Sequence, residues 1–354
     1  MTHYRLFRRA ALAGALALPL LTTGCGLFSQ EASESIDPPQ NSTQNVSGAA
    51  DNNGVDTAAA QQTDQSQMTL YLKDQNGLLA PVTVLASLGE SEKAGQKAIE
   101  MMVEDGQFAS ELPEGFQAIL PKGTTVKQFN LVPDQNLAIV DFSKSFSDYT
   151  AAEERQIVEA VTWTLTGMQG IKNVEIWMEG QKLAEMPVDG LPIDGPLTRA
   201  VGINLQAADG VNYSQSIPVT LYFAAVTPDD ESYYVPVTRL VNRSDNKAKS
   251  AIEQLISGPL DTDPLTAVIT PDVIVKSVTT TKDVVTVELQ DDAYQEGQKE
   301  PAQMLQAVIL ALTENTNATK VQIKLNGKTD VIDTNNQSYS KPVSRPEHVN
   351  AFKS

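Results

Sequence analysis

A duplicated segment constrains the fold of this chain more than any other feature of its sequence. Residues 156–181 align with residues 303–328 without a gap and share eight identical residues in twenty-six positions. Shorter matches recur at drifting offsets, and one of them pairs Thr69–Leu72 with Thr220–Phe223. Drifting offsets place the insertions in loops, so the sequence predicts one module duplicated in tandem. In a chain of 354 residues, each copy is long enough to bury its own core.

The apolar pattern predicts the same order of elements in both copies. In copy one, the expected elements are strands Met68–Leu72 and Pro81–Leu85, helix Glu92–Glu104, strands Val126–Val132 and Leu137–Phe142, a helix that starts with the capping box Thr150–Glu153, and strand Val174–Met178. In copy two, they are strands Val219–Phe223 and Tyr234–Thr238, helix Lys247–Ser257, strands Ile274–Thr279 and Val284–Leu289, and a helix whose first residue is Pro301. The order ββαββαβ predicts an α+β fold, in which each copy forms a small mixed or antiparallel sheet with two helices on one face.

Composition divides the chain into five parts. They are a signal peptide at 1–24, a lipidated cysteine with a disordered tether at 25–67, domain one at 68–186, a Pro/Gly-rich interdomain segment at 187–217, and domain two with a C-terminal tail at 218–354. The tether contains no lysine or arginine and too few apolar residues to fold. Both copies close with the pattern Pro-x-[Thr/Ser]-Arg followed by Asn. We expect this shared tail to pack back on its own domain and to keep the linker ordered.

The N-terminal residues predict a secreted, lipid-anchored protein. Arginines precede an uncharged run from Ala10 to Leu21, which at about 1.5 Å per helical residue is too short to span a bilayer. Thr-Thr-Gly24-Cys25 follows and resembles a bacterial lipobox, although Thr22 stands where leucine is usual. We expect cleavage after Gly24 and acylation of Cys25, for example by palmitate, which would hold the protein on the outer face of the cell membrane. A plain secretory signal with an incidental thiol is the alternative.

The sequence offers little for catalysis or metal binding. Its single cysteine excludes an internal disulfide framework, and its two histidines are His3, inside the signal peptide, and His348 near the C-terminus. None of the common zinc-protease, nucleophile-elbow, phosphate-loop or dinucleotide motifs occurs. Asp141 and Glu288 occupy equivalent strand positions and are interpreted as solvent-facing. We therefore predict no catalytic residue, no metal site and no cofactor.

Charge and the two tryptophans give the remaining indications about partners. A formal net charge of −18 repels phosphate backbones and argues against nucleic acid as a partner. Trp163 aligns with Leu310 and is interpreted as a core residue. Trp177 aligns with Lys324, which places it at an exposed strand position. We predict that Trp177 contacts a protein partner.

Together these features resemble a known family. The lipobox-like Cys25, the polar tether and the paired patterns Thr-Leu-Tyr, Ala-Ile-Glu and Ala-Val are similar to the GerM-like sporulation and germination lipoproteins with two GerMN domains. The resemblance covers roughly residues 20–354. It implies a fold like the ring-building modules of bacterial secretion rings. It also implies a role in assembling or anchoring the channel complex between mother cell and forespore, on the mother-cell membrane facing the intermembrane space.

We therefore expect a membrane-anchored, non-enzymatic protein that binds other envelope or sporulation channel proteins and that forms a ring or another homo-oligomer. Two alternatives stay open. A solute- or cell-wall-fragment-binding lipoprotein would need a ligand cleft between the copies, and a cell-wall hydrolase or its accessory would need paired carboxylates. A general envelope role outside sporulation is also compatible with the sequence.

Overall fold

The computed structural model describes residues 65–89 and 93–352. The signal peptide, Gly24, Cys25 and the tether up to residue 64 lie outside the described residues. Residues 65–67, which we assigned to the end of the tether, instead begin the first strand, where they pair with residues 85–87. Within the described ranges, no helix is long and apolar enough to cross a membrane.

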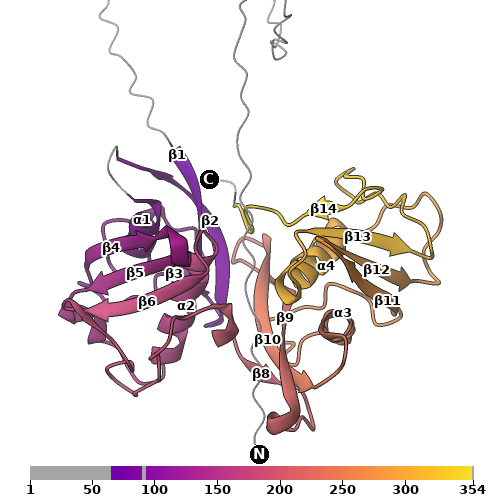
Figure 1. The fold of residues 1–354 in the computed structure, drawn as a ribbon. Coiled ribbons are helices and arrows are strands. Elements are labelled where there is room, and N and C mark those ends of the chain that lie inside the picture. Colours follow the sequence, from indigo (N-terminus) through magenta and orange to yellow (C-terminus); the bar gives the residue numbers. More distant parts are fainter. Residues whose placement is uncertain (1–64, 90–92, 353–354) are drawn as a thin grey trace, which may run out of the picture. The chain divides into compact units, whose positions relative to one another are not determined.

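Repeat one follows the predicted order of elements (Figure 1). Its elements are β1 Gln65–Asp74, β2 Leu79–Ser87, α1 Ala94–Met101, β3 Phe116–Gln117, β4 Val126–Val132, β5 Leu137–Phe142, α2 Glu154–Thr166, β6 Asn173–Met178 and β7 Gln181–Lys182. The predicted bounds of β4 and β5 are confirmed. A short Pro133–Gln135 turn joins these two strands, and Asn136 closes it with a left-handed backbone. Strand alternation and a Pro-Asp-x-Asn turn are both local signals, which explains why the sequence locates this hairpin well.

Repeat two has the same order of longer elements but no named strand between α3 and β11 to match β3, and it is preceded by the short strand β8 Gln206–Ala207. Its further elements are β9 Ser216–Val226, β10 Ser232–Asn242, α3 Lys247–Ser257, β11 Ile274–Thr281, β12 Val284–Gln290, α4 Ala302–Asn315, β13 Lys320–Leu325 and β14 Val343–Ser344. Helix α3 has the predicted bounds, because both of its ends carry local stop signals. The Asn246 side chain caps its start by accepting the Lys249 N–H at 2.9 Å, and Gly258 ends it. Pro301 precedes α4 as its cap residue and is not its first helical residue.

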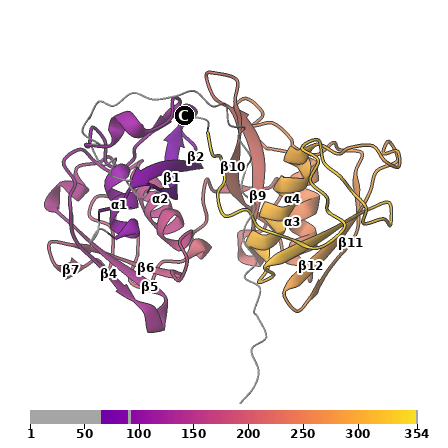
Figure 2. The same ribbon diagram turned by 90° about the horizontal axis from the view of Figure 1, so that it is seen from above.

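Each repeat contains two sheets, where we predicted one. In repeat one, β1 pairs with β2 and β3, while β4, β5, β6 and β7 form a separate mixed sheet in which β5 and β6 are parallel. In repeat two, β8, β10 and β9 form one sheet and β11 to β14 form the other. The helices pack against both sheets of their repeat: α2 contacts β1 and β6, and α4 contacts β9 and β13 (Figure 2). Strand order along the chain is as predicted, but alternation cannot tell which strands become neighbours.

The start of α2 also differs from the prediction. The Thr150 N–H and hydroxyl both donate to the Glu153 carboxylate, at 2.9 and 2.8 Å, but the helix begins only at Glu154. Glu154 is buried and instead accepts the N–H groups of residues 188, 189 and 191 from the interdomain segment. These contacts fix the Pro/Gly-rich segment against the start of the helix.

A single apolar core runs through both repeats. Helix α2 is buried along almost its whole length, from Ile157 to Leu165, and α4 is buried in the same way. A helix that is buried on every side lies between two layers, and here the layers are the two sheets of its own repeat. Strand β2 of repeat one packs beside β10 of repeat two. The interface between the repeats is therefore built from the first hairpin of each.

Candidate interaction surfaces at the junction of the repeats

The described residues hold no cluster of metal-ligating side chains. The carboxylate of Asp141 is buried, and its two oxygens accept the Gly180 N–H at 3.0 and 3.1 Å, so it supports the turn between β6 and β7. The prediction that Asp141 faces solvent is therefore wrong. His348 lines a hollow together with Phe129 and Leu131. Lys93 and Glu347 line the same hollow, but within the part of the chain that the structure describes neither Asp141 nor His348 takes part in an ion pair.

Trp177 lies half-buried on the outer face of the β4–β7 sheet. Its indole Nε1 donates to Glu175 at 3.1 Å, and Glu175 also pairs with Lys182 at 2.7 Å. Ile139 lies on the same face of the neighbouring strand β5, where it pairs with Glu175. The aligned residues of repeat two are Thr286 and Lys324. Only repeat one therefore presents apolar side chains at these two positions, and the proposed partner contact at Trp177 stays a prediction.

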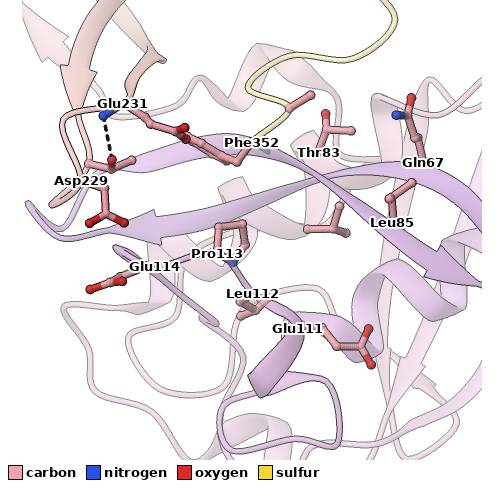
Figure 3. Close-up of a pocket in the computed structure, with 13 residues that line it drawn as sticks. Gln67, Thr83, Leu85, Glu111, Leu112, Pro113, Glu114, Asp229, Glu231 and Phe352 are labelled. Carbon is pink, nitrogen blue, oxygen red and sulfur yellow. Dashed lines mark hydrogen bonds between the residues drawn. The ribbon is translucent and has the colours of Figure 1, made fainter. Parts of the chain in front are cut away.

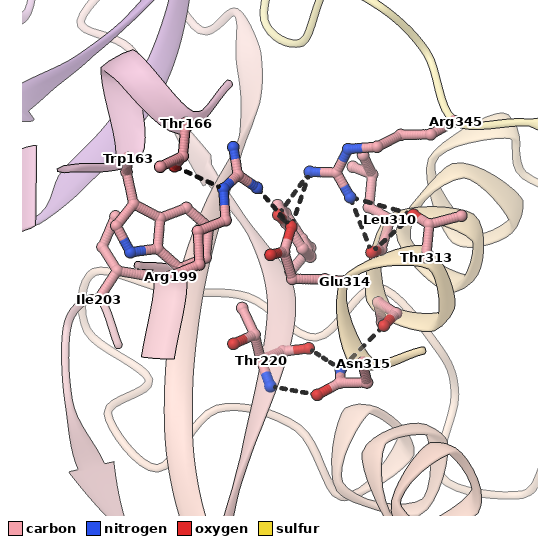
Figure 4. Close-up of polar contacts among 12 residues, drawn as sticks. Trp163, Thr166, Arg199, Ile203, Thr220, Leu310, Thr313, Glu314, Asn315 and Arg345 are labelled. Carbon is pink, nitrogen blue, oxygen red and sulfur yellow. Dashed lines mark hydrogen bonds and ion pairs between the residues drawn. The ribbon is translucent and has the colours of Figure 1, made fainter. Parts of the chain in front are cut away.

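One carboxylate at the junction binds two arginines (Figure 4). Glu314, near the end of α4, accepts from Arg199 Nη1 at 2.6 Å and from Arg345 Nη2 at 3.2 Å. The Tyr222 hydroxyl lies 3.2 Å from the same oxygen. Burial by itself raises the pKa of Glu314, but the guanidinium groups of Arg199 and Arg345 outweigh it and hold that pKa below its ordinary value. Glu314 is therefore ionised near neutral pH and pairs with an arginine from each repeat.

The two arginines occupy equivalent places in the repeats, as their shared Pro-x-[Thr/Ser]-Arg pattern implies. Arg199 donates to the Thr166 hydroxyl at the end of α2, at 3.1 Å, and lies over the ring of Trp163. Arg345 donates to the Thr313 hydroxyl at the end of α4, at 3.0 Å. Each arginine therefore binds a threonine hydroxyl in the last turn of the second helix of its own repeat. Trp163 is fully buried, which confirms its interpretation as a core residue.

Two asparagines join the neighbouring strands β2 and β10. Asn204 accepts the Leu79 N–H at 2.9 Å and donates to the carbonyls of Leu79 and Pro236, both at 2.8 Å. Asn350 makes the corresponding set from the other repeat: it binds both backbone groups of Tyr234 at 2.8 Å and donates to the Pro81 carbonyl at 2.7 Å. The junction therefore has approximate twofold symmetry at the level of individual hydrogen bonds.

The tails that carry these residues each pack on both repeats. Each tail contacts its own domain, as predicted, through Arg199 and Arg345, and it also crosses to the other repeat, which was not predicted. The tail of repeat one runs beside β10, where the Thr238 N–H donates to the Ile203 carbonyl at 2.8 Å and β8 pairs in parallel at Leu240. The tail of repeat two runs beside β2, where the Thr83 N–H donates to the Asn350 carbonyl at 3.1 Å. The tail of each repeat thus pairs with the second strand of the other repeat.

A groove lies where the tail of repeat two crosses β2 (Figure 3). It has a volume of about 390 Å³ and takes its walls from both repeats. Its apolar lining consists of Val84, Leu85, Leu112, Pro113, Ala351 and Phe352. Four exposed carboxylates surround it: Glu111, Glu114, Asp229 and Glu231. None of the described residues that line the groove is a lysine or an arginine.

Sequence reasoning located the residues of the junction only in part. The shared Pro-x-[Thr/Ser]-Arg…Asn ending marked Arg199, Arg345, Asn204 and Asn350 as equivalent, but not as contacts between the repeats. Glu314 gave no signal, because its aligned residue in repeat one is Gly167. The groove could not be anticipated, because its walls come from segments more than 100 residues apart in the chain.

Comparisons with known proteins agree with the repeat structure. A family model described as "Germane: Sporulation and spore germination" matches residues 69–184 and again residues 220–331. The spore germination protein GerM of Bacillus subtilis is 36% identical to this chain, over 96% of this chain and 97% of GerM. The solved structure of the tandem GerMN domains of sporulation protein GerM from B. subtilis superposes with a TM-score of 0.75 at 34% identity, and covers 82% of this chain and 100% of that one. The chain therefore belongs to the GerM family of sporulation and spore germination proteins, with two tandem GerMN domains.

Proposed function

We propose that this protein is a lipid-anchored, non-enzymatic scaffold, which assembles or anchors a mother cell–forespore channel complex through protein–protein contacts. The observation that carries this proposal is the paired GerMN architecture itself. Two modules share one core and one ionic junction, and together they present several distinct surfaces without a catalytic constellation among the described residues. Such a unit is suited to adhesion and to assembly into rings or other oligomers.

The membrane anchor belongs to the same proposal. Acylation of Cys25 would confine the folded repeats to the outer surface of the membrane, with residues 26–64 between the lipid and β1. Confinement to a surface raises the effective concentration of each partner, so individually weak contacts suffice for assembly. The outer sheet face with Trp177 and the groove beside β2 are the surfaces we propose for these contacts.

Complementation tests the proposal directly. The full chain and a Cys25→Ala variant, each fused to a fluorescent protein, would be expressed in a B. subtilis strain without its own GerM. We expect the unaltered chain to restore heat-resistant, germinating spores and to concentrate at the engulfing membrane. The variant should fail in both respects at an equal protein level. A chain that restores spores without localising there, or a variant that works equally well, would contradict the anchored scaffold.

One observation favours a second candidate, a solute-binding lipoprotein. The groove between the repeats has a volume within the range of small-molecule sites. A cationic solute would suit its acidic rim. Thermal-shift measurements with amino acids, polyamines and cell-wall fragments would distinguish this candidate, because only a solute-binding protein should gain several degrees of stability.

A further inference from the structure

The outer edge of β2 carries backbone groups that point away from its partner strand β1. The Thr83 N–H already donates outward, to the tail of repeat two. The register between β1 and β2 is unbroken from Lys73 to Gln65, and the direction of the backbone groups alternates along an antiparallel strand. Leu85 and Ser87 therefore direct their N–H and C=O groups to the same edge as Thr83.

The twofold relation between the repeats shows what such an edge can bind. Thr83 corresponds to Thr238, since each hydroxyl meets the equivalent threonine of its first strand, at 3.0 and 3.1 Å. Leu85 then corresponds to Leu240, which β8 covers as a parallel strand. On β2, the described part of the tail forms its bridge at Thr83 and reaches no further along the edge. In the described residues, no strand therefore pairs with the edge at Leu85 and Ser87, whereas β8 pairs with the equivalent edge at Leu240.

The side chains around this edge favour an extended, amphipathic ligand. Leu85 is 50% exposed, and Leu112, Pro113 and Phe352 lie around it in the groove. A strand added beside β2 would place alternate side chains over this apolar floor. Its remaining side chains would point toward the rim of the groove.

The acidic rim of the groove indicates the charge of the ligand's remaining side chains. Its four carboxylates form no ion pair within the described residues, although several other acidic side chains of the chain do. Opposite charge on the ligand would be needed to neutralise them. A second copy of this chain is a poor source, because the protein carries a net charge of −18 and the segment from Gly26 to Gln67 contains no lysine or arginine.

We propose that the edge of β2 at Leu85 and Ser87 binds an extended segment of a partner protein, in which basic residues alternate with apolar residues, as an added strand. The inference deepens the proposed scaffold function and rests on it, since it names the surface and the chemistry of one partner. It differs from the contact at Trp177, which lies on another sheet.

The test uses residues 65–354 and a synthetic seven-residue peptide of alternating lysine and valine. Fluorescence anisotropy would measure its binding, and amide hydrogen exchange would locate it. We expect saturable binding that weakens with added salt, together with slower exchange at Leu85 and Ser87. A glutamate–valine peptide, and the lysine–valine peptide with alternate backbone nitrogens methylated, should bind at least about tenfold more weakly.

A matched pair of variants completes the test. Neutralising the rim with Glu111→Gln, Glu114→Gln, Asp229→Asn and Glu231→Gln should weaken binding about tenfold or more. Asp261→Asn with Asp263→Asn, in another exposed loop, should leave it unchanged.

Four results would each overturn the inference. The first two are equal binding by the methylated peptide and slower amide exchange at a site away from β2. The third is peptide binding that appears only after removal of Lys353 and Ser354, and the fourth is that no peptide binds, in which case the carboxylates only protect an open edge. A chain that restores spores but gives any of these results would reject the groove alone. A chain that binds the peptide but restores nothing would reject the scaffold function.

Discussion

Glu314 is the residue on which the junction depends most. Repeat one has Gly167 at the aligned position, so a single carboxylate serves the equivalent arginines of both repeats. Its side chain is only 9% exposed, and those of Arg199 and Arg345 are about a quarter exposed. A partly buried network of this kind contributes more than a surface pair, because removal of the shared anion leaves two cations facing each other.

Glu314→Gln should therefore lower the free energy of unfolding by about 2–3 kcal/mol. Glutamine keeps the size and one acceptor oxygen but removes the charge that both guanidinium groups face. Urea unfolding followed by circular dichroism would measure the change. Glu253→Gln is the control, because Glu253 forms an exposed pair with Lys249 at 3.6 Å, and its loss should be below about 0.5 kcal/mol. Equal effects of the two substitutions would contradict the role given to Glu314.

The same carboxylate should make stability depend on pH. Its pKa is lower in the folded protein than in the unfolded chain, so the unfolded chain binds more protons between the two values. The stabilisation is complete above the ordinary glutamate pKa of about 4.3 and is lost as the pH falls through the folded pKa. The stability difference between the wild-type protein and Glu314→Gln should thus shrink as the pH is lowered from about 6 to about 3. A constant difference over this range would show that Glu314 is not the titrating group.

At the scale of elements, the junction consists of two strands that lie side by side but are joined through side chains. Asn204 and Asn350 take the places where direct backbone pairing between β2 and β10 would otherwise be needed. Both residues adopt a left-handed backbone, with φ of 47° and 57°, which asparagine tolerates better than most residues. This explains in physical terms why the shared tail pattern ends in asparagine in both repeats.

Asn204→Ala and Asn350→Ala should each lower the free energy of unfolding by about 2–4 kcal/mol, because each leaves buried backbone groups of β2 or β10 unpaired and strains a left-handed residue. Thermal unfolding would measure the loss. Asn212→Ala is the matched control: this exposed asparagine caps only a short turn, and its loss should stay below about 1 kcal/mol. A similar loss in all three variants would mean that the bridges do not join the strands.

At the scale of the whole molecule, residues 65–354 should unfold as one unit. The apolar core, the shared Glu314 and the exchanged tails all cross between the repeats. Each repeat therefore loses part of its own stabilisation when the other unfolds.

The two tryptophans, Trp163 and Trp177, make this cooperativity measurable, because both lie in repeat one. Tryptophan fluorescence then reports repeat one, while far-ultraviolet circular dichroism reports both repeats. The two urea unfolding curves should coincide. Two separated curves would show that the repeats unfold independently. If weakening the junction separates the two curves in any variant, we expect this in Glu314→Gln.

Local signals account for what the sequence determined by itself. Hairpin β4–β5 and helix α3 have the predicted bounds, because alternation, a Pro-Asp-x-Asn turn, an asparagine cap and a closing glycine all act within a few residues. The duplication is equally readable, since identical residues at a nearly fixed offset need no structure to be seen. From these signals followed the α+β class, the order of elements and the membership in the family.

The tertiary structure alone decided how the two copies combine. The apolar face of a strand indicates that the strand is buried, but it does not indicate which element covers it. The split of each repeat into two sheets was therefore not predictable from the sequence. The exchange of tails, the sharing of Glu314 and the groove beside Leu85 all join the two repeats, and some of the contacts lie far apart in the chain, such as Thr83 with Asn350 and Arg199 with Glu314. Such contacts form only when both copies have folded against each other, because their free energy comes from the packed junction and not from any local sequence.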